Sequence, residues 1–296
     1  MIIIILIILG LCFGSFVNAL VFRLHMQSKK QSLNGSLESV KKKLKKQITE
    51  NRLQKTQNRY SILTGRSMCV NCKHELKAID LIPIFSWFML AGKCRYCKKP
   101  ISWQYPSVEI FTAVVFVLSY IFWPTDFNSI EYTIFGLWLA CLVGLTALIV
   151  YDIRWMILPN RIVLPLYFLG LGIIILRLIQ NPEALTLYQN LTAILIGGGL
   201  FYLIFQLSKG KWIGGGDVKL GFLLGALVGR ADYAFLMLFL ASLLGCLYIL
   251  PALASKKLKR SSRVPFGPFL IIATIIVVLF GNDIIIWYFD QILTTT

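Results

Sequence analysis

Long apolar stretches separated by short polar segments dominate this chain. Runs of roughly 20 apolar residues are candidates for membrane-spanning helices, and only one of the runs here is clearly shorter. The runs predict helices near residues 1–22, 107–123, 132–150, 162–179, 189–207, 218–229, 232–250 and 267–289. We therefore expect an all-α polytopic membrane protein with about eight transmembrane helices.

The first apolar run, 1–22, could also be the core of a signal peptide. It lacks a basic segment at its start, and Gly14, Ser15 and Asn18 lie inside the run rather than at an A-x-A cleavage site. We therefore expect residues 1–22 to form a retained transmembrane helix. Residues 23–106 are then a soluble loop, and residues 107–296 form the remaining transmembrane bundle.

The first half of the 23–106 loop is strongly basic. Between residues 27 and 59, apolar side chains recur at roughly helical spacing, at Leu37, Val40, Leu44 and Ile48. This pattern favours a solvated helix lying against anionic lipid headgroups. A docking arm for a protein partner is the alternative.

Composition and charge support a membrane protein rather than a nucleic-acid-binding one. The chain is 57% hydrophobic, with a mean hydropathy of +0.73 and a net charge of +17. Its Lys and Arg residues are concentrated, 28 of 30, in four segments that fall on one side of an eight-helix topology. Those segments are 23–106, 151–161, 208–219 and 252–266. An excess of Lys and Arg marks cytoplasmic loops, so we expect this side to be cytoplasmic and both termini to face out.

The second half of the loop carries two CxxC pairs, which are separated by 21 residues. Four thiolates at this spacing can close a tetrahedral Zn²⁺ site, and nearby lysines favour the thiolate forms. The ligands would be Cys69, Cys72, Cys94 and Cys97. Two disulfides are the alternative, which a reducing cytoplasm disfavours, and an iron–sulfur cluster is less favoured than zinc. Four sulfur ligands leave no open position, so the metal is expected to be structural.

The segment between the two CxxC pairs is apolar, "IDLIPIFSWFMLAG" at 79–92, but too short and broken to span a bilayer. We expect it to pack onto the membrane face. The three remaining cysteines lie in apolar runs and are most simply packing residues. They are Cys12, Cys141 and Cys246.

Two aspartates lie at predicted helix ends on the basic side: Asp152 in "LIVYDIRWMILPN" and Asp217 in "WIGGGDVKL". Ionisable groups at membrane depth are candidates for functional sites. The two residues are 65 positions apart, but the topology brings them to the same membrane level. Each also has a structural explanation. Asp217 could cap the following helix, and Asp152 could pair with Arg154 or Arg161.

Two carboxylates at hydrogen-bonding distance cannot both ionise, so one keeps a proton and the pair can hold a water between them. This is the chemistry of aspartic proteolysis, with the charged member as general base. The glycines before Asp217, Gly214 to Gly216, would let backbone approach an extended substrate or a facing helix. Lys219 could steady the ionised pair or extend to the headgroups.

Five blocks of sequence follow one another in a characteristic order. They are "GSFVNALVFRL" at 14–24, the tetracysteine block through "PISWQYPSVEI" at 100–110, "YDIRWMILPN" at 151–160, "GGGDVKL" at 214–220 and "VPFGPFL" at 264–270. In this order the blocks resemble the type IV prepilin peptidase family. The resemblance implies that Asp152 and Asp217 form a catalytic pair that cuts prepilin or pseudopilin leaders at the cytoplasmic membrane face. It also implies methylation of the new N-terminus by S-adenosylmethionine, and zinc ligation by the four loop cysteines.

The sequence identifies the methyl-transfer site less clearly than the aspartate pair or the cysteine cluster. Gly92 and Glu109 are candidates by position, and a turn glycine and a helix-end acid are the alternatives. Many members of the family have Leu-Pro-Asp where this chain has Leu158-Pro159-Asn160, so a third carboxylate is absent. A peptidase without methyl transfer, and a transporter whose aspartates bind ions, are the competing functions.

Overall fold

The computed structural model describes residues 1–41, 66–255 and 264–295. Within these ranges the chain is helical, and extended pairing is confined to two isolated β-bridges, Met68↔Glu75 and Lys93↔Pro100. The basic segment predicted at 27–59 is covered as far as residue 41, where it continues the first helix. Its remainder, including Leu44 and Ile48, lies outside the described residues.

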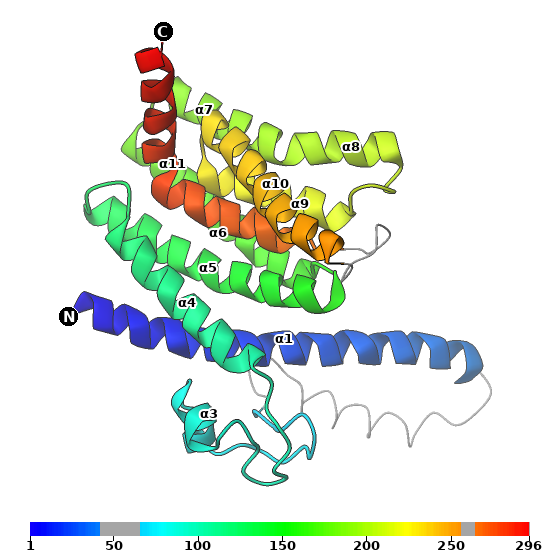
Figure 1. The fold of residues 1–296 in the computed structure, drawn as a ribbon. Helices are drawn as coiled ribbons and strands as arrows, with labels where there is room; N and C mark the ends of the chain where they lie inside the picture. Colours follow the sequence, from blue (N-terminus) through cyan, green and yellow to red (C-terminus); the bar gives the residue numbers. More distant parts are fainter. Residues whose placement is uncertain (42–65, 256–263, 296) are drawn as a thin grey trace. The chain divides into compact units, whose positions relative to one another are not determined.

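The chain divides into two compact units, Met1–Val115 and Phe116–Thr296, and the division falls inside helix α4 (Figure 1). The first unit contains α1 (Ile2–Lys41), η1 (Ala78–Leu81), α3 (Phe85–Met89) and most of α4 (Gln104–Ile121). The second contains α5 (Ser129–Trp155), α6 (Asn160–Gln180), α7 (Ala184–Ile194), the π-helical turn η2 (Leu195–Gly199), α8 (Leu200–Ser208), α9 (Gly215–Val228), α10 (Ala231–Ala254) and α11 (Gly267–Thr295).

The predicted all-α membrane fold is confirmed, with one short helix. Among the described residues, seven helical stretches are long and apolar enough to cross a membrane, with α7, η2 and α8 counting as one stretch. The remaining predicted helix, 218–229, is α9, which has 14 residues. At ~1.5 Å per residue it extends only ~21 Å, short of the ~30 Å hydrocarbon core.

In the first unit, α1 and α4 touch through glycines. A Cβ atom added at Gly10 would lie 2.5 Å from the Cα atom of Ala113, and one added at Gly14 would lie 2.5 Å from the Cα atom of Glu109. The two glycines are four residues apart on one face of α1. This is the small-residue spacing that lets transmembrane helices pack backbone against backbone.

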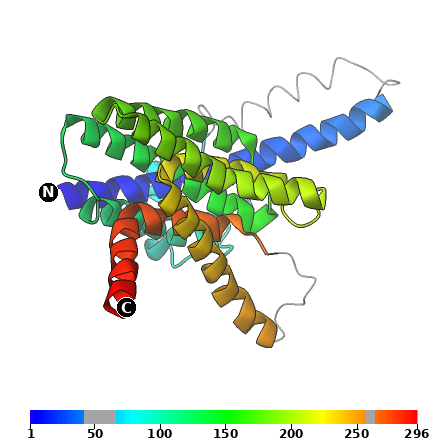
Figure 2. The same ribbon diagram turned by 90° about the horizontal axis from the view of Figure 1, so that it is seen from above.

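The second unit is built around α9, which is buried along nearly its whole length. It packs against α6, α7, η2, α8 and α11, while α10 and α11 pack together and α11 bends along its length (Figure 2). Gly221 and Gly225 of α9 face η2 and the end of α7. A Cβ atom at Gly221 would lie 2.4 Å from the Gly197 carbonyl oxygen, and one at Gly225 would lie 2.5 Å from the Ala193 carbonyl oxygen.

Polar contacts from α6 hold α9 at both ends. Near its start, the Tyr167 hydroxyl donates to the Lys219 carbonyl oxygen at 2.6 Å. At its end, the half-buried Arg177 side chain donates to the carbonyl oxygens of Ala226 at 3.4 Å and Leu227 at 2.8 Å. A cation at a helix C-terminus satisfies carbonyls that lack a helical partner and opposes the negative end of the helix dipole. The short helix is therefore fixed along its axis.

We predict that Gly225→Ala destabilises the protein by about 1–3 kcal/mol, because the new methyl group would overlap the Ala193 carbonyl oxygen. Thermal unfolding in detergent micelles measures this. Gly136→Ala in α5 is the matched control, since nothing lies within 4 Å of its added Cβ. Helix propensity alone would make both changes neutral or stabilising. Equal melting temperatures for the two variants would contradict the close packing of α9.

Candidate active site and metal centre

Asp152 lies in the last turn of α5 and is buried, with 5% of its surface exposed. Its Oδ2 atom accepts a hydrogen bond from the backbone N–H of Gly267 at 3.1 Å. Gly267 is the first residue of α11, so this N–H has no partner within the helix. The positive end of the α11 dipole therefore faces the carboxylate.

Asp217 lies in the first turn of α9 and is half-buried. The backbone N–H of Gly214, the residue that precedes the helix, interacts favourably with its carboxylate. The Asp217 carboxylate therefore lies at the start of α9, beside its N-cap residue.

The structure brings the two aspartates to one place. Their carboxylates are near enough to interact electrostatically. A Cβ atom added at Gly267 would lie 2.6 Å from Asp152 Oδ2 and 3.5 Å from Leu220 Cδ2, one helical turn after Asp217. The C-terminus of α5 and the N-termini of α9 and α11 therefore converge on the pair.

The glycines before Asp217 have different surroundings. A Cβ atom at Gly214 would lie 3.3 Å from the Asp217 Oδ2 atom, and one at Gly216 would lie 3.3 Å from Leu158 Cδ1. Gly214 thus leaves space beside the carboxylate, whereas Gly216 lets α9 approach the segment that follows α5. Gly215 faces Phe205 at an ordinary contact distance of 3.7 Å.

Lys219 is exposed, and its Nζ atom donates to the Asn160 Oδ1 atom at 3.0 Å. Asn160 is the first residue of α6. The lysine therefore links the start of α9 to the start of α6 through an amide. An aspartate at 160 would turn the same contact into an ion pair.

Reading the sequence alone missed the contact that Gly267 makes with Asp152. The block "VPFGPFL" carries a family resemblance but gives no role to any single residue. The signal available was a Gly-Pro pair at the start of a long apolar run, which is typical of a helix N-terminus. Nothing local indicates which carboxylate that N-terminus faces, because the partner lies 115 residues earlier.

The four predicted metal ligands lie together in the first unit. The Sγ atoms of Cys69, Cys72, Cys94 and Cys97 all lie within 4.8 Å of one another, and those of Cys69 and Cys97 are 3.9 Å apart. A tetrahedral site with Zn–S bonds of ~2.3 Å places its sulfurs about 3.8 Å apart. The donor set and its spacing therefore fit a zinc ion.

Hydrogen bonds favour the thiolate form of at least one of these ligands. Partial burial acts to raise the pKa of the Cys69 thiol. The backbone N–H groups of Cys72 and Asn71 and the side chains of Cys94 and Cys72 hydrogen-bond to it, and its pKa falls to about 7. A thiolate is the form that binds a metal.

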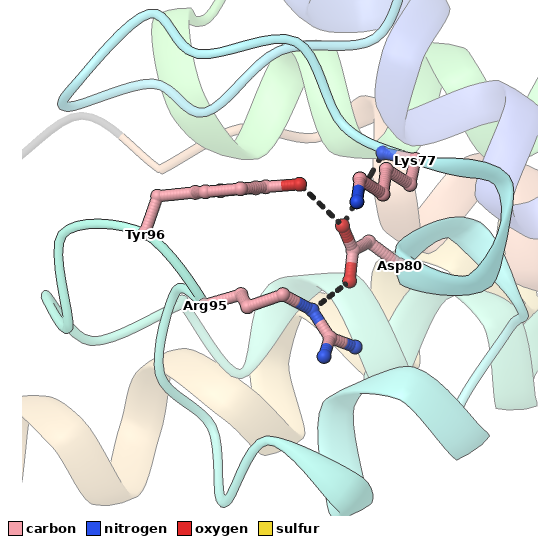
Figure 3. A network of polar contacts seen from close by, with 4 residues as sticks. All are labelled: Lys77, Asp80, Arg95 and Tyr96. Atoms are coloured by element: carbon pink, nitrogen blue, oxygen red, sulfur yellow. Dashed lines mark hydrogen bonds and ion pairs between the residues drawn. The ribbon is translucent and has the colours of Figure 1, made fainter.

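Asp80, which lies between the two cysteine pairs, is bound to the second pair through a network of polar contacts (Figure 3). Its carboxylate accepts from Arg95 Nε at 2.7 Å, from the Tyr96 hydroxyl at 3.4 Å and from the Lys77 backbone N–H at 3.2 Å. Arg95 and Tyr96 lie between the ligands Cys94 and Cys97. Burial acts to raise the pKa of Asp80, but the Arg95 and Lys77 contacts outweigh it and hold that pKa below its usual value.

The two methyl-transfer candidates, Gly92 and Glu109, each make a contact that stabilises the local fold. Gly92 has a φ of +66°, and a Cβ atom there would lie 3.0 Å from the ring of Trp87. Glu109 is buried in α4, and its Oε2 atom accepts the backbone N–H of Ile84 at 2.7 Å. The structure thus places Gly92 in a tight turn and Glu109 at a contact between α4 and the segment that joins the cysteine pairs.

We predict that the purified protein binds one zinc ion and that Cys94→Ser removes it, because three thiolates and a hydroxyl bind zinc weakly at neutral pH. Inductively coupled plasma mass spectrometry after gel filtration measures the metal content. The control is Cys246→Ser, since that exposed cysteine lies in α10 outside the cluster. Retention of zinc by the Cys94 variant would contradict the four-cysteine site.

Two family models match successive parts of the chain. The Bacterial Peptidase A24 N-terminal domain matches residues 8–123, and the Type IV leader peptidase family matches residues 139–250. The first match contains the cysteine cluster, and the second contains both aspartates. No solved structure matches significantly.

Curated relatives match most of the chain. The prepilin leader peptidase/N-methyltransferase of Aeromonas salmonicida strain A449 is 33% identical, over 79% of this chain and 78% of that protein. The protein of the same name from Stutzerimonas stutzeri is 30% identical, over 94% and 90%. The type 4 prepilin-like proteins leader peptide-processing enzyme of Escherichia coli O78:H11 is 31% identical, over 88% and 87%. With both halves matched in order, the chain belongs to the type IV leader peptidase family.

Proposed function

We propose that this protein is a membrane aspartic endopeptidase that removes the leader peptide of type IV prepilins and methylates the new N-terminal amine. The observation that carries the proposal is the convergence of Asp152 and Asp217 where three helix ends meet. Its relatives, named prepilin leader peptidase/N-methyltransferase, support both activities. The substrates would be prepilins or pseudopilins, and nucleic acid would have no part in the reaction.

In the proposed reaction, Asp152 and Asp217 share one proton and hold a water molecule between them. The ionised carboxylate takes a proton from the water molecule, and the water oxygen bonds to the scissile carbonyl carbon. The neutral carboxyl group hydrogen-bonds to the carbonyl oxygen. A proton then passes to the leaving amine as the C–N bond breaks. The N–H of Gly267 fixes the Asp152 side chain, and Asp217 lies beside the N–H of Gly214.

We further propose a multi-pass protein of the bacterial inner or plasma membrane, with the aspartate pair and the cysteine cluster on the cytoplasmic side. The concentration of Lys and Arg in the 23–106, 151–161, 208–219 and 252–266 segments supports this orientation. A prepilin could then keep its apolar N-terminal helix in the lipid while its basic leader reaches the carboxylates. Gly214 and Gly216 would give the peptide backbone clearance, and Lys219 would position the start of α9.

The proposed cofactors are a structural zinc ion held by the four loop cysteines and S-adenosylmethionine as methyl donor. The zinc ion would hold the two CxxC turns together and leave no ligand position open for substrate. The methyl-transfer site would lie in the first unit, with Gly92 and Glu109 as candidates. The turn at Gly92 and the contact that Glu109 makes with Ile84 would then shape the site.

We predict that Asp152→Asn and Asp217→Asn each reduce leader cleavage by a factor on the order of 10³ or more, because neither variant can share a proton between two carboxylates. Cleavage of a purified prepilin in nanodiscs, followed by mass spectrometry of the product, measures the loss. The control is Asp232→Asn, which removes an exposed ion pair with Arg230 at the start of α10. If either active-site variant cleaves at the control's rate, the assignment of the pair is wrong.

We predict that Gly267→Ala lowers kcat for cleavage about 100-fold with little change in KM, because its Cβ atom would displace the Asp152 carboxylate. Gly245→Ala in α10 is the control, since its added Cβ would meet Phe269 at an ordinary contact distance of 3.8 Å. A wild-type kcat for the Gly267 variant, measured with the same prepilin assay, would exclude this positioning role.

A further inference from the structure

The segment between the two cysteine pairs exposes large apolar side chains in an otherwise polar lobe. The short helix α3 leaves Phe85 54%, Phe88 62% and Met89 69% exposed. Ile79 and Ile82, just before it, are 55% and 43% exposed. Apolar surface of this kind on a soluble lobe marks an interaction site.

The remaining aromatic residue of α3 is turned the other way. The Trp87 indole Nε1 donates to the Ile101 carbonyl oxygen at 3.5 Å, and its ring lies 4.2 Å from the ring of Trp103. The turn at Gly92 closes over the same ring. Trp87 therefore fixes α3 on the chain that leads into α4, with Phe85, Phe88 and Met89 pointing outward.

A hydrogen bond to α4 sets the depth of α3. The backbone N–H of Ile84, which precedes α3, donates to the buried carboxylate of Glu109 at 2.7 Å. α4 is a membrane-spanning candidate of 18 residues, which extend ~27 Å at ~1.5 Å per residue, so its whole length is needed for a hydrocarbon core of ~30 Å. Glu109 lies five residues, or ~7.5 Å, inside its first residue. The start of α3 therefore reaches the depth of the bilayer boundary.

Trp103 supports the same depth independently. It immediately precedes α4 and is 67% exposed, and tryptophan concentrates at the membrane–water interface. Through its contact with Trp87 it fixes one side of α3 at that level. The exposed side chains of α3 thus lie beside the lipid that surrounds the start of α4.

The charge of the lobe suits an anionic membrane surface. Residues 66–103 contain seven basic and two acidic side chains. The basic residues are Arg66, Lys73, Lys77, Lys93, Arg95, Lys98 and Lys99, and the acidic ones are Glu75 and Asp80. An apolar face combined with excess Lys and Arg is the composition of segments that lie in the interface of anionic bilayers.

We infer that residues 82–89 form an interfacial segment whose Phe85, Phe88 and Met89 side chains insert among phospholipid acyl chains. The Glu109–Ile84 hydrogen bond anchors this segment to α4, and the zinc-binding lobe is thereby held against the bilayer through its own protein–lipid contact. The partner of this surface is phospholipid, rather than the prepilin or a second copy of the chain.

Photocrosslinking in nanodiscs that contain an anionic phospholipid tests the inference. The full-length protein would carry a benzophenone amino acid in place of Phe88, or, as the matched control, in place of Val70, which is 47% exposed on the first cysteine pair. We expect an adduct with the mass of one phospholipid at 88, formed in several-fold higher yield than at 70. The readout is mass, so it does not depend on the protein being a peptidase.

A crosslink from position 88 to added prepilin, to a second copy or to residues 116–296 would overturn the inference, as would the absence of any lipid adduct. Equal lipid yields at 70 and 88 would also contradict it. Tryptophan quenching checks the result without altering α3. Phospholipid brominated near its headgroup should quench the wild type more than Trp103→Phe, and equal quenching of the two would count against the proposed depth.

Discussion

The arrangement of the second unit depends on placing two carboxylates together in a low-dielectric bundle. Like charges repel strongly where water is scarce, and each buried carboxylate needs hydrogen-bond donors. Helix N-termini supply those donors here. The N–H of Gly267, at the start of α11, donates to Asp152, and Asp217 lies beside the N–H of Gly214 at the start of α9. Three helices must therefore end or begin at the same point.

The helix α9 differs from its neighbours in length. It stops after 14 residues at Gly229, in the left-handed region with φ +70°, which makes it too short to cross the hydrocarbon core. Its position is set by close backbone contact with η2 at Gly221 and by Arg177 at its end. Backbone contacts at small residues and hydrogen bonds from Arg177 thus hold this short helix in place.

In the first unit, glycine contacts and a carboxylate that accepts a backbone N–H also hold the elements together. Gly10 and Gly14 bring α1 against α4, and the Glu109 carboxylate on α4 receives the N–H of Ile84. The tetracysteine lobe therefore meets its transmembrane helices through a specific hydrogen bond as well as through covalent connections. Zinc and the Asp80 network would hold the lobe together, and the Glu109 carboxylate ties its Ile84 to α4.

Much of this protein could be predicted from the sequence because its determinants are local. A run of apolar residues must become a helix in lipid, since every backbone polar group there needs an internal partner. In each CxxC motif, the two metal ligands are only three residues apart. The order of the predicted helices places Asp152 and Asp217 at the same membrane level. The family resemblance added the proposed chemistry to those positions.

Tertiary structure decided the contacts between residues far apart in the chain. That Gly267 faces Asp152, that Arg177 caps α9, and that Glu109 receives Ile84 depend on helix rotation and depth, which apolar periodicity leaves open when a helix is apolar on every side. The sequence by itself determined which segments become helices and where the carboxylates and thiols lie along them. Only the packing of those helices, set by glycine contacts and buried polar groups, decided which of these groups meet.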